Sequence, residues 1–105
     1  MTDKVLVLTT AGNQSEAQKI ARELVARRLA ACVNIIPRIQ SVYRWKGKIE
    51  NAEEFLLIIK TTKARSADVQ AAIRELHSYD LPECIVISIE DGSAEYLKWI
   101  EDSVG

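Results

Sequence analysis

The stretch 38-RIQSVYRWKGKI-49 decides the fold, because its residues alternate strictly between two faces. The odd-numbered residues, which include Tyr43 and Trp45, fall on one face, and the mostly polar even-numbered residues fall on the other. A single strand from Ile39 to Ile49 would extend roughly 36 Å, whereas a typical strand has about 5–6 residues. Since a chain of 105 residues folds to a radius of gyration of about 13 Å, the pattern predicts a ribbon that overhangs its own domain.

On either side of this ribbon, short apolar runs alternate with amphipathic helices. Pro37, which cannot donate a ladder hydrogen bond, is expected at an edge or bulge where the ribbon begins, and Gly47 at a bulge near its far end. Ser15 and Ser66 are placed to cap the first two helices, and Ser93 begins the third. The expected strands are residues 4–10, 32–37 leading into 39–49, 54–62 and 84–90, with a turn at 50–53; the expected helices are 15–31, 66–77 and 91–104.

The order of these elements predicts an α+β fold. A strand, a helix, two strands, a helix and a strand match the ferredoxin-like βαββαβ sandwich, in which both main helices cover one face of a four-stranded antiparallel sheet. The helix expected at 91–104 is an addition to that pattern. We expect residues 1–105 to form a single domain, because this length and a hydrophobic fraction of 48% suit one packed core.

The expected strands are apolar on both faces, which two helices cannot cover. In 55-FLLII-59, Phe55, Leu57 and Ile59 face one way, while Leu56 and Ile58 face the other. A sheet that is buried on one side should alternate cleanly, and each exposed Leu or Ile forgoes about 1.5–3 kcal/mol of burial. The pattern therefore predicts that other copies of the chain cover the second face.

Composition argues against several classes of partner. The formal net charge is −1, and acids and bases are interleaved, so the concentrated basic patch that nucleic acid or an anionic membrane needs is not expected. The first ten residues hold only one short apolar run, and no stretch reaches transmembrane length, so neither a signal peptide nor a membrane anchor is expected. Cys32 and Cys84 lie in separate apolar runs and are interpreted as reduced core thiols. These features predict a cytoplasmic protein.

Four stretches together carry a family resemblance over nearly the whole chain. They are 28-RLAACVNIIPRIQSVYRWKGKIE-50, 53-EEFLLIIKT-61, 77-HSYDLPE-83 and 92-GSAEYLKWI-100. Through them the chain closely resembles the CutA family of divalent-cation tolerance proteins. The resemblance implies a role in tolerance to divalent metal ions, copper in particular.

The resemblance also implies an assembly, a homotrimer of ferredoxin-like subunits whose long strands pair between subunits. The same trimeric architecture occurs in nitrogen-regulatory signalling proteins, which bind small effectors in clefts between subunits. No GxSxG or HExxH motif is present, so enzymatic activity is not expected. The residues expected at the trimer interface are Ile39, Tyr43, Trp45, Ile49 and Trp99.

The resemblance implies a metal site that joins the end of the first strand to histidines before a Pro-Tyr pair. Here Thr9 stands where cysteine would be the stronger ligand, and one histidine, His77, precedes Ser78. His77 is therefore the candidate ligand for weakly bound Cu²⁺ or another divalent cation; a plain helix-end role, favoured by the helix dipole, is the alternative. No cofactor is required. The candidates expected to line an intersubunit cleft are Thr9, Trp45, Lys60, Tyr79 and Glu83.

Two hypotheses for function follow. The first is a non-enzymatic trimer that acts in divalent-metal tolerance through weak metal binding. The second is a signalling or adaptor trimer that holds a small organic or anionic ligand in its clefts. Lys60 would either extend out of the sheet or pair with Glu83. Tyr43 and Trp45 are expected to pack across a subunit interface rather than to stack on nucleic-acid bases.

Overall fold

The computed structural model describes residues 2–105, and a four-stranded antiparallel sheet forms its centre. The strands lie in the order β2-β3-β1-β4. The expected mixed α+β order of elements, with one more helix after the last strand, is confirmed. The strands are β1 (Lys4–Ala11), β2 (Cys32–Trp45), β3 (Lys48–Thr62) and β4 (Ile85–Ser88), and the helices are α1 (Gln14–Ala26), α2 (Lys63–Leu76) and α3 (Ala94–Ser103).

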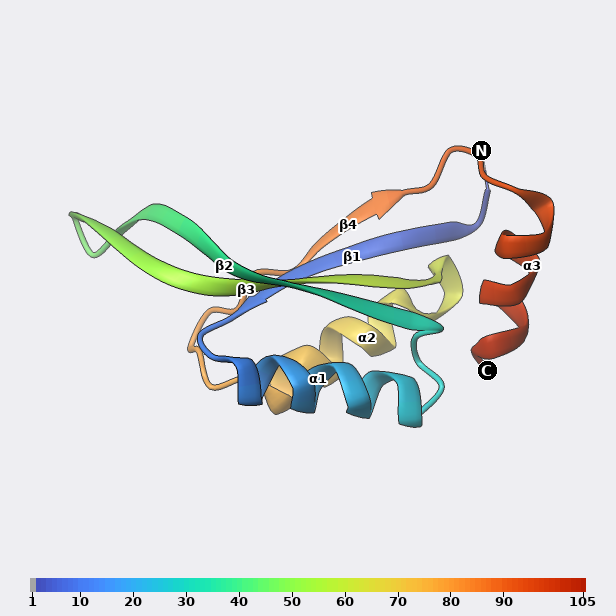
Figure 1. Ribbon diagram of the computed structural model, residues 1–105, viewed down its shortest axis with the longest axis horizontal. Coiled ribbons are helices and arrows are strands. Elements are labelled where there is room, and N and C mark those ends of the chain that lie inside the picture. The colour runs from blue at the N-terminus through green and yellow to red at the C-terminus, as the bar shows by residue number, and fades with distance from the viewer. Residues whose placement is uncertain (1) are drawn as a thin grey trace.

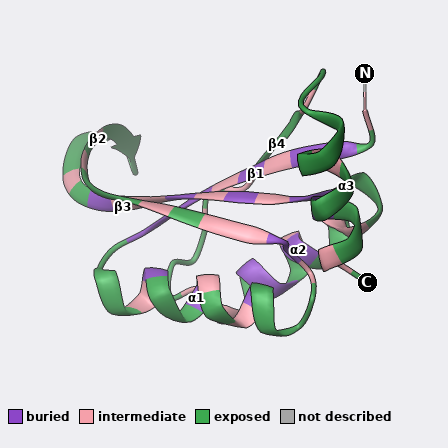
Figure 2. Cartoon of the chain, turned by 45° about the vertical axis from the view of Figure 1, so that its right-hand side comes forward, coloured by how far each residue is buried: buried purple, intermediate pink, exposed green. Residues whose placement is uncertain are grey.

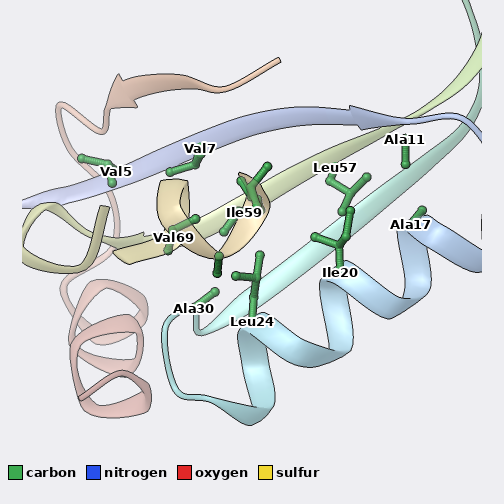
Figure 3. Close-up of a cluster of buried hydrophobic side chains, with 12 residues drawn as sticks. Val5, Val7, Ala11, Ala17, Ile20, Leu24, Ala30, Leu57, Ile59 and Val69 are labelled. Atoms are coloured by element: carbon green, nitrogen blue, oxygen red, sulfur yellow. The ribbon is translucent and has the colours of Figure 1, made fainter. Parts of the chain in front are cut away.

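The core lies between the sheet and the helix pair α1 and α2, which both lie against the same face (Figure 1). Val7, Leu57 and Ile59 point from the sheet towards Ile20 and Leu24 of α1, and all five side chains are fully buried (Figure 3). Ile20 and Leu24 are four residues apart, so they share one face of the helix. Each such side chain contributes about 1.5–3 kcal/mol through burial.

The opposite face of the sheet, which we call the far face, has no such cover from α1 or α2. The strand register places Leu8 beside both Ile58 and Ile85, and Leu6 beside Ile87. Ile85 and Ile87 remain 49% and 43% exposed. The predicted surplus of apolar residues on the second face is therefore present in the structure. The far face carries Leu6, Leu8, Ile36, Leu56, Ile58, Ile85 and Ile87.

Residues 39–54 form a two-stranded arm that projects beyond the rest of the sheet (Figure 1). β1 pairs with β3 only from Phe55 to Thr62, so the earlier part of β3 pairs with β2 alone. The arm stretches the molecule to 44 × 26 × 22 Å, and most of its residues are exposed (Figure 2). Because an isolated two-stranded hairpin is marginally stable in water, the arm needs further contacts.

The prediction of one continuous strand over residues 39–49 is wrong. Trp45 pairs with Lys48, and the chain reverses at Lys46 and Gly47, whose φ angles are 50° and 79°. Positive φ at both central residues is the geometry of the tight hairpin turns that match the twist of the strands, and glycine adopts it readily. Gly47 therefore makes the turn and is not a bulge.

The early turn also changes which residues share a face. Ile49 lies on β3 opposite Arg44, so it faces away from Tyr43 and Trp45 rather than with them. The predicted turn at residues 50–53 is wrong as well, because those residues belong to β3.

The predicted break at Pro37 is confirmed. The β2–β3 ladder shifts register between Ile36 and Ile39, and Arg38 has a φ of 59°. A proline and a left-handed residue at one place leave the ladder unpaired there and bend the strand. The bend turns the arm away from the line of the sheet.

Both predicted helix caps are wrong. Asn13, not Ser15, caps α1, and its side-chain oxygen accepts a hydrogen bond from the backbone N–H of Glu16 at 2.8 Å. Helix α2 begins directly after the extended residue Thr62, so Ser66 lies inside the helix. Ser93 lies at the start of α3, as expected, and its side chain caps the helix. The sequence Lys-Ala-Arg favours helix, which is why α2 starts before the first serine.

Helix α3 packs against the end of the sheet next to the N-terminus (Figure 1). Ile100 is fully buried, and Glu101 Oε1 lies 3.1 Å from the Nζ atom of Lys4. No helix within residues 2–105 is long and apolar enough to cross a bilayer.

Candidate functional site: an acidic, aromatic cleft

A cleft of about 760 Å³ opens between the arm and the loop that joins α2 to β4. Its volume falls in the range of about 300–1,000 Å³ that small-molecule sites occupy. The arm supplies one wall, the loop supplies the other, and β1 contributes one residue. The lining residues are Gln40, Ser41, Val42, Tyr43, Trp45 and Glu54 from the arm, Thr10 from β1, and Tyr79, Asp80, Leu81, Pro82 and Glu83 from the loop.

The lining is acidic and aromatic. Of the described residues around the cleft, three carry carboxylates, three carry aromatic rings and none is a lysine or an arginine. The described lining is therefore richer in acids than the whole chain, whose net charge is only −1. The acids are Glu54, Asp80 and Glu83, and the aromatic residues are Tyr43, Trp45 and Tyr79.

A hydrogen bond joins the two walls. The Oη atom of Tyr79 donates to Oε2 of Glu54 at 2.8 Å, and Glu54 is only 7% exposed. Burial of the phenol and its bond to Glu54 together raise the pKa of Tyr79 far above its usual value. Gly12 makes room for this ring, because a Cβ at that position would lie 3.0 Å from the Oη atom. Tyr79 thus fixes a nearly buried carboxylate in the floor of the cleft.

Glu83 faces the same cleft from the loop. Burial disfavours its charged form, and the charge of Glu54 acts in the same direction, so both raise the pKa of Glu83 above its usual value of 4.5. A carboxylate whose ionisation is opposed by burial and by a neighbouring charge of the same sign favours a bound cation.

Glu83→Gln is expected to stabilise the protein at neutral pH. The raised pKa means that the folded state holds the Glu83 proton more tightly than the unfolded state does. The resulting stabilisation is complete below pH 4.5 and is lost as the pH rises through the raised value. The glutamine variant should therefore exceed the wild type in free energy of unfolding at pH 7, by a small amount because Glu83 is largely exposed, and the gap should close below pH 4.5. Urea denaturation between pH 4 and pH 7.5 measures this, and a gap that is constant with pH would contradict it.

His77 lies behind the loop wall and does not line the cleft. Its side chain is fully buried. The Nε2 atom donates to the backbone oxygen of Thr10 at 2.5 Å, and Nδ1 accepts from the backbone N–H of Tyr79 at 3.1 Å. A carbonyl only accepts and a backbone N–H only donates, which assigns the Nε2–H tautomer. Both ring nitrogens are occupied, so in this arrangement neither is available to a metal ion.

His77 therefore holds the loop wall in place. Its bonds tie the start of the loop to β1, and Glu16 of α1 adds a second tie by accepting from the backbone N–H of Ser78 at 3.2 Å. The rings of His77 and Tyr79 lie 4.5 Å apart. These contacts hold the start of the loop in the position from which the Tyr79 hydroxyl bonds to Glu54.

Five residues were predicted to line a cleft between subunits; three of them line this cleft within one subunit, and two do not. Trp45, Tyr79 and Glu83 line it, whereas Thr9 is fully buried on the helix-covered face beside Leu57. Thr9 lies away from this cleft because successive strand residues face opposite ways, and its neighbour Thr10 lines the cleft.

Lys60 is the other predicted cleft residue that the structure places elsewhere. Its Nζ atom lies 3.3 Å from Oη of Tyr96 and 5.6 Å from the centre of that ring. The amino group is therefore held by α3 at the opposite end of the sheet from the arm, and it does not pair with Glu83.

Thr10, Glu54, Asp80 and Gly12 are site residues that the sequence did not reveal. Only Glu54 carried a signal, as an acid immediately before the apolar run 55-FLLII-59. Its partner Tyr79 is 25 residues away, which no local pattern connects.

Strong metal ligands do not converge in the described part of the chain. Within residues 2–105, no three His, Cys, Asp or Glu side chains are grouped to hold an ion. Cys32 and Cys84 are free and partly buried, and burial raises the pKa of the Cys84 thiol, which keeps it from the thiolate form that binds metals. A metal ion in the cleft would depend chiefly on Glu54 and Glu83.

The predicted trimer-interface residues lie at the surface of the chain. Tyr43, Trp45, Ile49 and Trp99 are exposed, and Ile39 is partly exposed. Trp99 stacks beside Tyr96, with ring centres 5.4 Å apart. Their role at an interface stays a prediction.

Comparison with known proteins gives a consistent family. Residues 5–103 match the model of the CutA1 divalent ion tolerance protein. A CutA homolog of Xenopus laevis is 47% identical over 95 residues, which are 90% of this chain and 63% of that protein, so the chain spans less than two thirds of that relative. A crystal structure of CutA from Xylella fastidiosa superposes with a TM-score of 0.97 at 39% identity, over 99% of this chain and 100% of the other. The CutA structure from Archaeoglobus fulgidus, described as a periplasmic divalent cation tolerance protein, gives 0.94 at 42% identity, over 97% of this chain and 99% of the other.

Proposed function

The chain belongs to the CutA1 divalent ion tolerance protein family, and from that membership we propose that it acts in tolerance to divalent cations, copper among them, by binding them weakly in the cleft. The names of the relatives include no enzymatic activity, and the proposal involves none. No other cofactor is part of it.

One observation carries the proposal: the carboxylates of Glu54 and Glu83 line the same cleft. Burial and the charge of Glu54 both raise the pKa of Glu83, so a cation bound beside these carboxylates would relieve an existing repulsion. Carboxylate oxygens suit hard divalent ions better than soft ones. Two carboxylates without imidazole or thiolate support weak binding, which is the strength that we propose.

Calorimetric titration with Cu²⁺ and Zn²⁺ tests this function. We expect saturable binding that weakens at least fivefold in Glu83→Gln, because one of two anionic ligands is lost. Glu90→Gln, an exposed acid outside the cleft, is the matched control and should bind like the wild type. His77→Gln tests His77, the metal ligand predicted from the sequence. Metal binding equal to that of the wild type would assign the site to the carboxylates, and complete loss of binding would assign it to His77. No saturable heat with any form would refute metal binding.

We propose that the working form is a homotrimer of ferredoxin-like subunits, in which neighbouring copies cover the far face and the arm. Two features support it. Isoleucines on the far face are nearly half exposed, and the arm lacks a third strand although isolated hairpins are marginal in water. The strand order β2-β3-β1-β4 with two helices on one face fits the ferredoxin-like arrangement.

A second candidate function is a signalling or adaptor trimer whose cleft holds a small ligand. The aromatic rings of Tyr43, Trp45 and Tyr79 in the lining favour it, since rings of this kind typically bind organic molecules. Native mass spectrometry of the purified assembly separates the two candidates, because a retained organic mass favours the second and retained metal favours the first.

We propose a cytoplasmic location, which the two free thiols support, because reducing compartments preserve unpaired cysteines. The alternative is a periplasmic location, which is how the CutA structure from Archaeoglobus fulgidus is described. Cell fractionation decides between them, and recovery in the periplasmic fraction would refute the cytoplasmic assignment.

A further inference from the structure

Glu16 holds one carboxylate oxygen in the interior without a hydrogen-bond donor. Its Oε2 atom accepts from the backbone N–H of Ser78 at 3.2 Å, whereas its Oε1 atom is buried and meets no donor within residues 2–105. The side chain as a whole is 14% exposed. Because a buried acceptor without a donor is costly, nearly all such groups in folded proteins are paired. The unpaired oxygen of Glu16 therefore calls for an explanation.

The His77 ring lies beside this oxygen. Oε1 of Glu16 is 3.6 Å from Nδ1 of His77, which is longer than the usual N–H···O distance of about 2.7–3.2 Å. In the Nε2–H tautomer Nδ1 carries no proton, so both atoms are acceptors and no bond joins them. A proton on Nδ1 would supply the missing donor, and a movement of under about 1 Å would bring the two atoms within bonding distance.

The same proton would break the contact that holds the loop. Nδ1 now accepts from the backbone N–H of Tyr79 at 3.1 Å, and a protonated Nδ1 is a donor that cannot bond to a second donor. The Nε2–H bond to the carbonyl of Thr10 needs no change. Since Tyr79 also carries the hydroxyl that bonds to Glu54, release of its backbone loosens the loop wall of the cleft.

The charge next to the ring favours a proton. The groups that face the ring are the carboxylate of Glu16 on α1, the carbonyl of Thr10 on β1, and the N–H and phenol of Tyr79 in the loop, behind which Glu54 of β3 accepts from the phenol. In the last turn of α2, Arg74 and Glu75 are exposed. An imidazolium beside the buried carboxylate makes a pair without net charge, whereas the neutral ring leaves that carboxylate uncompensated.

We propose that His77 and Glu16 form a pH-sensitive switch: on proton uptake from solvent, Nδ1 donates to Oε1 of Glu16 and gives up the Tyr79 N–H, which loosens the loop wall. Only hydrogen bonds change. The switch needs no open surface, because the His77 side chain is fully buried and Glu16 is largely buried within one subunit, so a neighbouring copy over the arm leaves the pair in place. It needs no metal ion and is independent of the proposed function.

Nuclear magnetic resonance of metal-free, ¹⁵N-labelled protein tests the switch. His77 is the sole histidine, so the imidazole signals need no further assignment, and imidazole exchanges its proton between about pH 8 and pH 5. On acidification we expect both ring nitrogens to carry protons, and the exchange protection factor of the Tyr79 amide to fall about fivefold or more, while that of Val7 in the core stays constant. A ring that stays neutral, constant protection of Tyr79 while the ring titrates, or loss of far-ultraviolet circular dichroism along with protonation would each overturn the proposal.

Matched variants on α1 assign the acid. Glu16→Gln keeps an acceptor for the Ser78 N–H, and its amide can donate to Nδ1, which holds the ring neutral. We expect the midpoint of the imidazole titration to fall by about one pH unit or more, a tenfold loss of proton affinity, and Tyr79 to stay protected to lower pH. Glu23→Gln removes the same charge from a more exposed position of the helix and should titrate like the wild type. Equal midpoints in the two variants would overturn the assignment to Glu16.

Discussion

Ile87→Lys is expected to convert a trimer of about 35 kDa into monomers of 11.8 kDa without unfolding the chain. Ile87 lies on the far face beside Leu6 and is 43% exposed in the isolated subunit. A lysine there can reach solvent in a monomer. In a trimer that covers this face, the three lysine ammonium groups would be buried away from water and would repel one another. Each lost isoleucine also removes about 1.5–3 kcal/mol of burial per subunit. Sedimentation velocity measures the mass, and far-ultraviolet circular dichroism checks the fold.

Val25→Lys is the matched control for this experiment. Val25 has the same 43% exposure but lies on α1, on the helix side of the sheet. Its lysine variant should sediment as the wild type does. If Ile87→Lys leaves the mass unchanged, or if the wild type itself sediments at 11.8 kDa, then the far face is not an interface and the trimer proposal fails.

His77→Ala is expected to lower the free energy of unfolding by about 2–5 kcal/mol. The substitution leaves a cavity where a fully buried ring stood. It also removes the partners of the Thr10 carbonyl and the Tyr79 N–H. With the loop wall released, Tyr79 should lose its fixed approach to Glu54. Denaturant unfolding at a constant protein concentration measures the stability, and hydrogen exchange should be faster in residues 78–83.

Two further variants separate this positioning role from a general effect of substitution. Ser78→Ala changes the neighbouring exposed side chain, which makes no described hydrogen bond, and should stay within about 0.5 kcal/mol of the wild type. His77→Gln keeps a donor that can reach Thr10 and should recover part of the loss. If His77→Ala costs less than about 1 kcal/mol, or if exchange in the loop is unchanged, then His77 does not hold the wall.

The arm shows how far periodicity reaches. Strict alternation in residues 38–49 predicted an extended segment that overhangs the domain, and residues 39–54 do form a projecting arm, as a hairpin of two strands. Alternation did not reveal the reversal at Lys46 and Gly47, because a two-residue turn leaves the pattern of residue types intact while the chain changes direction. Ile49 was consequently assigned to the wrong face.

The site shows a different limit. Trp45, Tyr79 and Glu83, which were predicted for a cleft between subunits, line this cleft of the single subunit, whereas Thr9 is one residue away from Thr10, which lines it. Alternate residues of β1 face opposite sides of the sheet, so Thr9 and Thr10 lie on different faces. Which of the two faces the helices cover is decided only by the fold. Glu54 and Tyr79 are 25 residues apart, and His77 and Thr10 are 67 apart, so neither contact has a local signature.

The sequence by itself determined the order of strands and helices, the surplus of apolar residues on the far face and the family, because each of these follows from residue types at regular spacing. Only the tertiary structure decided that 38-RIQSVYRWKGKI-49 is a hairpin. It contains the end of β2, the turn at Lys46 and Gly47, and the first two residues of β3. The tertiary structure also decided that His77 is enclosed and that the carboxylates gather beneath aromatic rings in one cleft. Those outcomes depend on backbone dihedral angles at two residues and on contacts between distant segments, which exist only once the chain has folded.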